Sequence, residues 1–289
     1  MAKLVTLRHR IASVTGTRQI TKAMQLVSAS KLKRAQAQAV ASRDYRAVAY
    51  ELLSRLSASR EIMDGPLFAR RPVKTKLYVI MTSNSGLAGA YNANVLKRLI
   101  ALSREDQARQ VVSQVIAVGT KGAQLVRHLA GVDMIAYYPF FGNHPTQNDV
   151  QPLLRSIVDG YSERKTDEVH VLYTFAPSRI KQEVVDLKLL PAETPIADDS
   201  PAAHVMNFEP SAEVVVDHVA TRLIEVQLWQ AVLESLASEH LSRMLAMKSA
   251  TDNATDLIAD YTLTYQTERQ AAITQELAEI TGGAEAVRD

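Results

Sequence analysis

The chain has 289 residues, of which 47% are hydrophobic and 22% charged, and its formal net charge is +2. This composition excludes a fibrous chain and a wholly disordered one. Because cysteine is absent, disulfides, thiolate metal sites, iron–sulfur clusters and a cysteine nucleophile are also excluded. No apolar run approaches the roughly 20 residues that cross a bilayer. Residues 1–5 do not resemble a signal peptide, so we expect a soluble, non-secreted protein.

Residues 1–60 form a basic arm without proline. They contain twelve Lys and Arg against two acidic residues, a net charge of +10. Without proline, the arm is free to be helical. Apolar residues recur every three or four positions, change register near Gly16, and then give way to small residues that let a second helix approach closely. The predicted inward-facing positions are Leu4, Leu7, Ile11 and Val14, then Ile20, Met24 and Val27, then Ala35, Ala39, Ser42, Ala49, Leu53 and Leu56.

Residues 75–190 alternate between strand and helix patterns. Strands are predicted at 76–82, 111–118, 134–138, 169–175 and 184–190, and helices at 92–102, 149–161 and, as a short one, from Gly119 onward. This alternation predicts a Rossmann-like α/β domain with a parallel-type sheet covered by helices. Residues 191–210 contain four prolines and are predicted to be a linker.

Residues 211–289 form an acidic arm. Five basic residues stand against thirteen acidic ones, a net charge of −8, and the arm has no proline and no glycine before residue 282. An uninterrupted helix over residues 211–281 would be roughly 100 Å long. Its mostly apolar spacing of three and four persists for about seven heptads, which is typical of a supercoiling helix. The positions are Val216, Val219, Leu223, Val226, Gln230, Leu233, Ala237, His240, Met244, Met247, Thr251, Ala254, Ile258, Tyr261 and Tyr265.

The two arms are predicted to form a long antiparallel two-helix coiled coil. A helix with one apolar stripe is marginal alone in water, and the opposite net charges of the arms favour their pairing. The predicted fold class is therefore α/β, with the coiled coil added to the central domain. The predicted boundaries are 1–60, 75–190, 191–210 and 211–289. The alternative is an ordinary helical bundle whose helices break along each arm.

The sequence predicts no catalytic, cofactor or metal site. The glycine loop at 83–90 lacks the GxGxxG spacing and the P-loop lysine, so it is interpreted as a structural turn rather than a nucleotide site. The GxxG at 119–122 is a weak signal for RNA binding. Seven scattered histidines include no HExxH, and no GxSxG occurs. The basic cluster of Lys31, Lys33 and Arg34 is either a contact surface or a solvated face, and the lack of interleaved aromatics favours protein over nucleic acid.

Both arms resemble the gamma subunit of F-type ATP synthases. The resemblance is carried by residues 10–14 and 20–32 of the basic arm and by residues 238–254 and 269–280 of the acidic arm. The family signature ITxExxE is present as Ile273, Thr274, Glu276 and Glu279. The middle of the chain is similar to the family more loosely. Asn84, Ser85 and Ala88 stand where the family loop S-D-R-G-L-C-G has an acid, a base and a cysteine.

The resemblance implies a non-catalytic rotor without cofactors. Its paired helices would thread a hexameric ring of alpha and beta subunits, and its α/β domain would join the epsilon subunit and the c-ring. Torque carried by the chain would couple proton flow to ATP synthesis on the ring. The resemblance also implies no nucleic-acid partner, membrane contact only through partners, and a place at the cytoplasmic face of a bacterial inner membrane.

Contact residues follow from the same resemblance. Met24, Lys31, Lys33 and Arg34 match the segment that meets an acidic lever of the catalytic subunit. Arg269, Gln270, Thr274 and Glu276 match the segment held by a catch loop of the ring, and Phe208 and Glu209 match the region above the c-ring. The alternative hypothesis is a free-standing nucleotide- or nucleic-acid-binding α/β protein with helical extensions.

Overall fold

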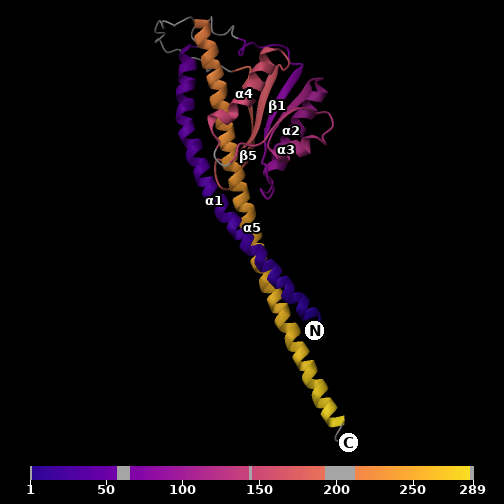
Figure 1. The fold of residues 1–289 in the computed structure, drawn as a ribbon. Helices are drawn as coiled ribbons and strands as arrows, with labels where there is room; N and C mark the ends of the chain where they lie inside the picture. Colours follow the sequence, from indigo (N-terminus) through magenta and orange to yellow (C-terminus); the bar gives the residue numbers. More distant parts are fainter. Residues whose placement is uncertain (1, 57–65, 143–144, 193–211, 287–289) are drawn as a thin grey trace. The chain divides into compact units, whose positions relative to one another are not determined.

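The computed structural model describes residues 2–56, 66–142, 145–192 and 212–286, with side chains described over 3–42, 66–142, 145–192 and 219–281. The chain divides into two compact units. Unit 1 consists of Met1–Ser28 and Arg243–Asp289, and unit 2 of Ala29–Ser242. Helices α1 (Ala2–Leu56) and α5 (Ala212–Ala286) each contribute residues to both units (Figure 1).

Unit 2 contains a five-stranded sheet with the order β3-β2-β1-β4-β5. Strands β1 to β4 pair in parallel, whereas β5 pairs antiparallel to β4. The prediction of a parallel-type sheet was therefore wrong for β5. Only residues 176–182 connect β4 to β5, which is enough for a hairpin but too short for the crossover that a parallel neighbour requires. The strands are β1 (Thr75–Met81), β2 (Val112–Val118), β3 (Asp133–Tyr138), β4 (Glu168–Phe175) and β5 (Glu183–Leu190).

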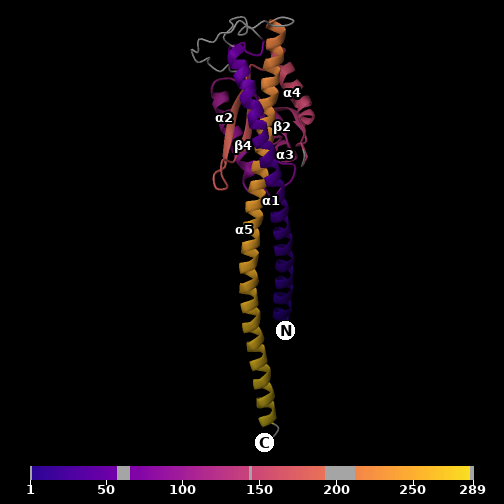
Figure 2. The same ribbon diagram turned by 90° about the vertical axis from the view of Figure 1, so that its left-hand side faces the viewer.

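Helices cover both faces of this sheet. Alternate residues of a strand point to opposite faces, so Tyr78 and Ile80 of β1 pack with α2 (Tyr91–Ala108) and α3 (Thr120–Val126). Leu77, Val79 and Met81 pack on the other face, in the core that contains α4 (Gln147–Ser162) and α5. Figure 2 shows α2 and α4 on opposite sides of the sheet. Helix α4 begins with a capping box in which Thr146 and Asp149 bond each other's backbone amides.

The unit 2 part of α5 is enclosed on nearly every side. All residues from Leu223 to Leu236 are buried, which is the pattern of a core helix rather than of a two-helix seam. Ala35 and Ala39 of α1 are buried in the same core. The small side chain of Ala39 leaves its carbonyl within reach of Gln230 Nε2, at 3.4 Å. The predicted small-residue face of the basic arm is thus confirmed at Ala35 and Ala39, and Ser42 is half-buried. Ala49, Leu53 and Leu56 lie outside the residues whose side chains are described.

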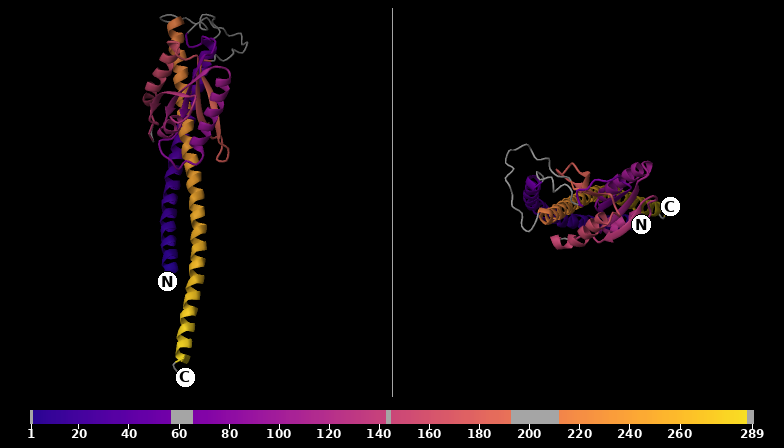
Figure 3. Two further views of the ribbon diagram at one scale, coloured as in Figure 1. Left: turned by 90° about the vertical axis from the view of Figure 1, so that its right-hand side faces the viewer. Right: turned by 90° about the horizontal axis from the view of Figure 1, so that it is seen from above.

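In unit 1 the two helix segments run antiparallel, as predicted. Lys3 Nζ contacts Glu268 Oε1 at 2.5 Å, and the hydroxyls of Thr21 and Thr251 hydrogen-bond at 2.8 Å. Along α5 the covered positions keep the predicted spacing of three and four, from Met247 through Ala254. Helix α5 then continues from Glu268 to Ala286, about 27 Å at 1.5 Å per residue, past its contact with Lys3 (Figure 3).

The predicted register shift near Gly16 is wrong. Ile20 and Val27, predicted to face the partner, are 62% and 53% exposed, and Met24 is half-buried. One register instead continues through polar residues, because the Thr21 hydroxyl finds a partner in Thr251 and is thereby stabilised in the seam. Its covered positions are Leu4, Leu7, Ile11, Val14, Arg18, Thr21, Gln25, Ser28, Leu32, Ala35 and Ala39.

Candidate contact surfaces and polar networks

The predicted basic contact residues all lie on α1. Met24 belongs to unit 1 and is half-buried, whereas Lys31, Lys33 and Arg34 belong to unit 2. Lys33 and Arg34 are exposed, and Lys31 is half-buried. Lys31 and Arg34 are three residues apart and therefore neighbours on one helix face. In unit 1 the large apolar residues Ile20, Leu26 and Val27 are exposed on the same helix. The predicted register had placed Ile20 and Val27 against the partner helix.

The predicted C-terminal contact residues lie on the part of α5 that follows Glu268. Arg269, Gln270, Thr274 and Glu276 are all exposed. Thr274 Oγ1 donates to the carbonyl of Gln270 at 2.9 Å, so this hydroxyl is bonded within its own helix. Sequence reasoning did not assign a contact role to the exposed apolar residues between and beyond them. These are Ile273, Leu277 and Ile280.

Some of these polar and apolar residues lie on one face of α5. At 3.6 residues per turn, Arg269, Ile273, Glu276 and Ile280 follow one another along the same side of α5. Contiguous exposed apolar side chains bordered by charges are typical of protein contact surfaces. Phe208 and Glu209, the remaining predicted contact residues, lie outside the described residues.

A buried ion pair links α2 to the first strand. Lys76 Nζ lies 2.7 Å from Asp106 Oδ1, and the Tyr78 hydroxyl donates to Asp106 Oδ2 at 2.5 Å. Ser113 of β2 contacts the same carboxylate at 3.2 Å. Burial, and next the hydrogen bond to Asp106, raise the pKa of Tyr78 far above its ordinary value. Tyr78 therefore remains a protonated donor, and Asp106 is held by three different partners.

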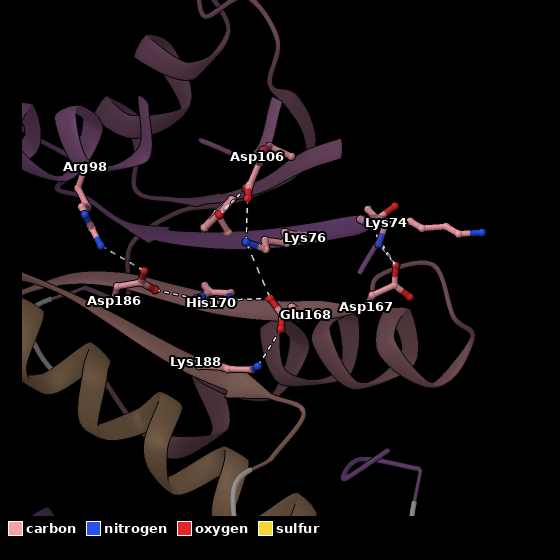
Figure 4. Close-up of polar contacts among 12 residues, drawn as sticks. Lys74, Lys76, Arg98, Asp106, Asp167, Glu168, His170, Asp186 and Lys188 are labelled. Atoms are coloured by element: carbon pink, nitrogen blue, oxygen red, sulfur yellow. Dashed lines mark hydrogen bonds and ion pairs between the residues drawn. The ribbon is translucent and has the colours of Figure 1, made fainter. Parts of the chain in front are cut away.

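The same sheet face continues as a chain of charges over β4 and β5 (Figure 4). Glu168 accepts from Lys188 at 2.7 Å, and His170 Nδ1 lies 2.7 Å from Asp186 Oδ1. Arg98 of α2 contacts Asp186 at 3.6 Å. Burial acts to raise the pKa of both Glu168 and Asp186. The contact with Lys188 outweighs burial at Glu168, the contact with His170 outweighs it at Asp186, and both pKa values are lowered. The paired charges join α2 to three strands, which is a structural role.

Asp167 connects the start of β1 to the start of β4. It accepts from Arg71 Nε at 2.7 Å and from the backbone amides of Lys74 and Thr75 at 2.9 and 3.0 Å. Arg71 also donates to the carbonyls of Tyr161 and Thr166. Burial acts to raise the pKa of Asp167, but these amide and guanidinium donors lower it overall.

The glycine loop at 83–90 is filled by its own side chains. Asn84 Oδ1 accepts from the amides of Thr120 and Phe140, and its Nδ2 donates to the Phe140 carbonyl. The side-chain oxygen Oδ1 of Asn84 therefore occupies the position at which an anion would bind these amides. Gly119 is needed because its φ is +101° and a Cβ there would lie 2.1 Å from the Thr82 carbonyl oxygen. This geometry favours the structural interpretation of the loop.

Neither a metal site nor a membrane span is found among the described residues. Among them, no group of three or more His, Asp or Glu side chains is placed to hold a metal ion. Of the helices there, none combines the length and apolar character that a membrane span requires.

Comparison with known proteins decides the family. A family model described as ATP synthase matches residues 3–287. The ATP synthase gamma chain of Geotalea uraniireducens is 38% identical over 288 residues, and the alignment covers all of both chains. The gamma chain of Moorella thermoacetica is 39% identical with the same coverage. The chain belongs to the ATP synthase gamma chain family. It is therefore a component of an ATP synthase, a membrane-bound complex, and the predicted resemblance is confirmed.

Solved structures agree with the fold. A chain of the Euglena gracilis mitochondrial ATP synthase (OSCP/F1/c-ring) gives a TM-score of 0.68 at 17% identity, covering 99% of this chain and 95% of that one. A chain of the Tetrahymena thermophila mitochondrial ATP synthase (central stalk/c-ring) gives 0.61 at 22% identity, with coverage of 80% and 99%. The mixed α/β fold with a long C-terminal helix is thus shared with these chains.

Proposed function

We propose that the chain is the non-catalytic rotor of a bacterial ATP synthase. It transmits torque between a hexameric ring of alpha and beta subunits and the c-ring, and so couples proton flow to ATP synthesis. The observation that carries the proposal is the antiparallel helix pair of unit 1. Its seam is closed by the Thr21–Thr251 bond and by covered positions at heptad spacing, while its outer faces are exposed.

The two arms, 1–60 and 211–289, supply the shaft in this proposal. A helix pair with unlike faces offers a different surface to each catalytic subunit as it turns, and differential contacts can shift a subunit's conformation. ATP chemistry then belongs to the ring and not to this chain. The described polar networks support this division, because their charged groups are bonded to one another in structural roles.

The α/β domain at 75–190 supplies the base of the rotor, with the linker at 191–210. The proposed partners there are the epsilon subunit and the c-ring, with Phe208 and Glu209 as c-ring contacts. The chain would lie at the cytoplasmic face of the bacterial inner membrane and be attached to it through these partners. Gamma chains of bacteria at 38–39% identity over the whole length support this placement.

The proposed ring contacts divide into two sets. Met24, Lys31, Lys33 and Arg34 would contact the acidic lever of the catalytic subunit, for which the exposed Lys33 and Arg34 offer positive charge. Arg269, Gln270, Thr274 and Glu276 would contact a catch loop. Their support is that all four are exposed on the part of α5 that follows Glu268, interleaved with exposed apolar residues.

The test replaces Arg269→Ala and Gln270→Ala together in the chain, assembled with ring subunits, epsilon and c-ring in vesicles. Charge-assisted contacts contribute about 1.5–3 kcal/mol each, so we expect at least a tenfold weaker complex or a matching loss of ATP synthesis. The control, Lys248→Ala with Gln266→Ala, changes two exposed residues on the paired part of α5. A wild-type chain that fails to co-migrate with the ring would contradict the proposal, and full synthesis in the Arg269/Gln270 variant would contradict the assigned contact.

A further inference from the structure

In unit 2, directed hydrogen bonds reach α5 from several surrounding elements. Apolar burial of Leu223, Leu228 and Leu233 holds the helix in the core. The hydrophobic effect has no direction, however, and does not by itself specify how far a helix is turned about its axis. Hydrogen bonds do specify it, because they weaken steeply as distance and angle change.

The central bonds lie within six residues of α5. The Tyr173 hydroxyl of β4 donates to Glu234 Oε2 at 3.1 Å, and the Tyr91 hydroxyl at the start of α2 lies 2.6 Å from Ser235 Oγ. Gln230 Nε2 reaches the Ala39 carbonyl of α1 at 3.4 Å and Glu234 Oε1 at 2.7 Å. Tyr91 is 1% exposed and Tyr173 7% exposed, so water competes little for these bonds.

Two more bonds reach the unit 2 part of α5 on either side of these six residues. Gln151 of α4 donates to Glu225 Oε1 at 2.6 Å, and Ser242 donates to Gln182 in the β4–β5 connection at 2.6 Å. Successive residues of a helix point about 100° apart. Glu234 and Ser235 therefore meet β4 and α2 on different sides of α5, and turning the helix in either direction strains at least one bond.

We propose that the Tyr91–Ser235 and Tyr173–Glu234 hydrogen bonds fix the rotational setting of α5 within the α/β domain, and that torque passes between the domain and the helix through them. This inference rests on the proposed rotor function. Tyr91 and Tyr173 are positioning residues in this role, since they act on α5 and not on a reacting group. Three more bonds support the same rotational setting of α5. Gln230 of α5 bonds to α1, and Gln151 of α4 and Gln182 of the hairpin bond to residues of α5.

The test uses the assembled complex in vesicles with the double variant Tyr91→Phe and Tyr173→Phe, which removes both hydroxyls and keeps both rings. Each lost hydrogen bond makes a turned setting of α5 about fivefold more populated, and both together about 25-fold. We expect ATP hydrolysis to remain within about twofold of the wild type, while protons pumped per ATP fall to about half or less. A merely stabilising role would leave that ratio unchanged.

Tyr161→Phe is the matched control. Tyr161 is also fully buried, and its hydroxyl donates to the Ala69 carbonyl at 2.7 Å, a bond that joins α4 to the segment before β1 and not to α5. A wild-type pumping ratio in the double variant, or an equal loss in Tyr161→Phe, would overturn the inference. If the double variant does not assemble, Ser235→Ala removes one bond from the α5 side, and an undiminished ratio there would also overturn it. Failure of the wild-type complex to pump would instead count against the rotor function.

Discussion

Helix α5 has two different environments along one continuous helix. In unit 2 every residue from Leu223 to Leu236 is buried, including Glu225 and Glu234. In unit 1, from Met244 to Thr281, only Met247, Thr251 and Ala254 are buried. The unit 2 part is thus a core helix, and the unit 1 part is one half of a two-helix seam.

The difference changes what the polar side chains of α5 require. Where α5 is surrounded, each buried polar group needs a defined partner, because an unpaired one costs about 1–3 kcal/mol. Glu234 and Ser235 have such partners in Tyr173 and Tyr91. Where α5 has one neighbouring helix, most of its residues are exposed. The unit 2 part of α5 is therefore held by bonds to several elements, whereas the unit 1 part leaves most of its residues exposed.

The largest expected contrast compares Leu223→Ala in unit 2 with Leu263→Ala in unit 1. Leu223 is 1% exposed and lies in the core, whereas Leu263 is 70% exposed on the same helix. Leu223→Ala should cost about 2–5 kcal/mol of the free energy of unfolding through lost burial and a cavity, and Leu263→Ala within about 0.5 kcal/mol. Urea unfolding followed by fluorescence of Trp229, the sole tryptophan, reports unit 2. Equal costs would contradict the contrast.

A smaller effect, confined to unit 2, is expected from Asp167→Asn. The carboxylate bonds of Asp167 to Arg71, Lys74 and Thr75 require the ionised form. Removing the charge should cost about 1–3 kcal/mol at neutral pH. The pKa of Asp167 is lowered in the folded chain, so this stability is present above the ordinary Asp pKa of about 4 and is lost as the pH falls below it.

The measurement is the unfolding free energy of both chains at pH 7, 5, 4 and 3. The difference between wild type and Asp167→Asn should be greatest at pH 7 and 5 and should shrink toward pH 3. Asp133→Asn changes an exposed carboxylate of β3 and serves as the control. A difference for Asp167→Asn that is constant with pH would show that the charge of Asp167 does not carry its contribution.

The sequence predicted element types better than their partners. The strand predicted at 169–175 is observed at Glu168–Phe175, and the helix at 149–161 is observed at Gln147–Ser162. The direction of β5 was missed because periodicity is the same in parallel and antiparallel strands. The length of the connection at 176–182 could have shown it. The helix register around Thr21 was missed because it was predicted from the spacing of apolar residues alone. That spacing cannot detect a buried seam position occupied by two hydrogen-bonded threonines.

The charged network was not predicted from the sequence. Its pairs join residues far apart in the chain, such as Lys76 with Asp106 and Tyr78 with Asp106. A signal was nevertheless present, because three strands each place two polar residues two positions apart on one face: Lys76 and Tyr78, Glu168 and His170, Asp186 and Lys188. The two sets of ring contacts and the c-ring contact remain predictions, since a contact surface is defined by its partner.

The smallest expected effect is in unit 1, at the Lys3–Glu268 ion pair. It joins the two helices at 2.5 Å, but the side chains are 69% and 34% exposed. Exposed pairs contribute about 0–1 kcal/mol, because water and side-chain entropy offset the attraction. A double-mutant cycle of Lys3→Ala and Glu268→Gln, followed by helical circular dichroism, should therefore give a coupling energy below about 1 kcal/mol.

High salt and a second lysine provide two controls for this measurement. At 1 M salt the screening length is about 3 Å, so the coupling between Lys3 and Glu268 should fall toward zero. Lys22→Ala removes an exposed lysine of the same helix, whose Nζ contacts Gln25 within its own helix at 3.4 Å, and should show no coupling to Glu268→Gln. A coupling that exceeds about 1.5 kcal/mol or persists in high salt would mean that an exposed polar pair in unit 1 contributes as much as the buried bond between Tyr173 and Glu234 in unit 2. The contrast between the buried and exposed parts of α5 would then fail.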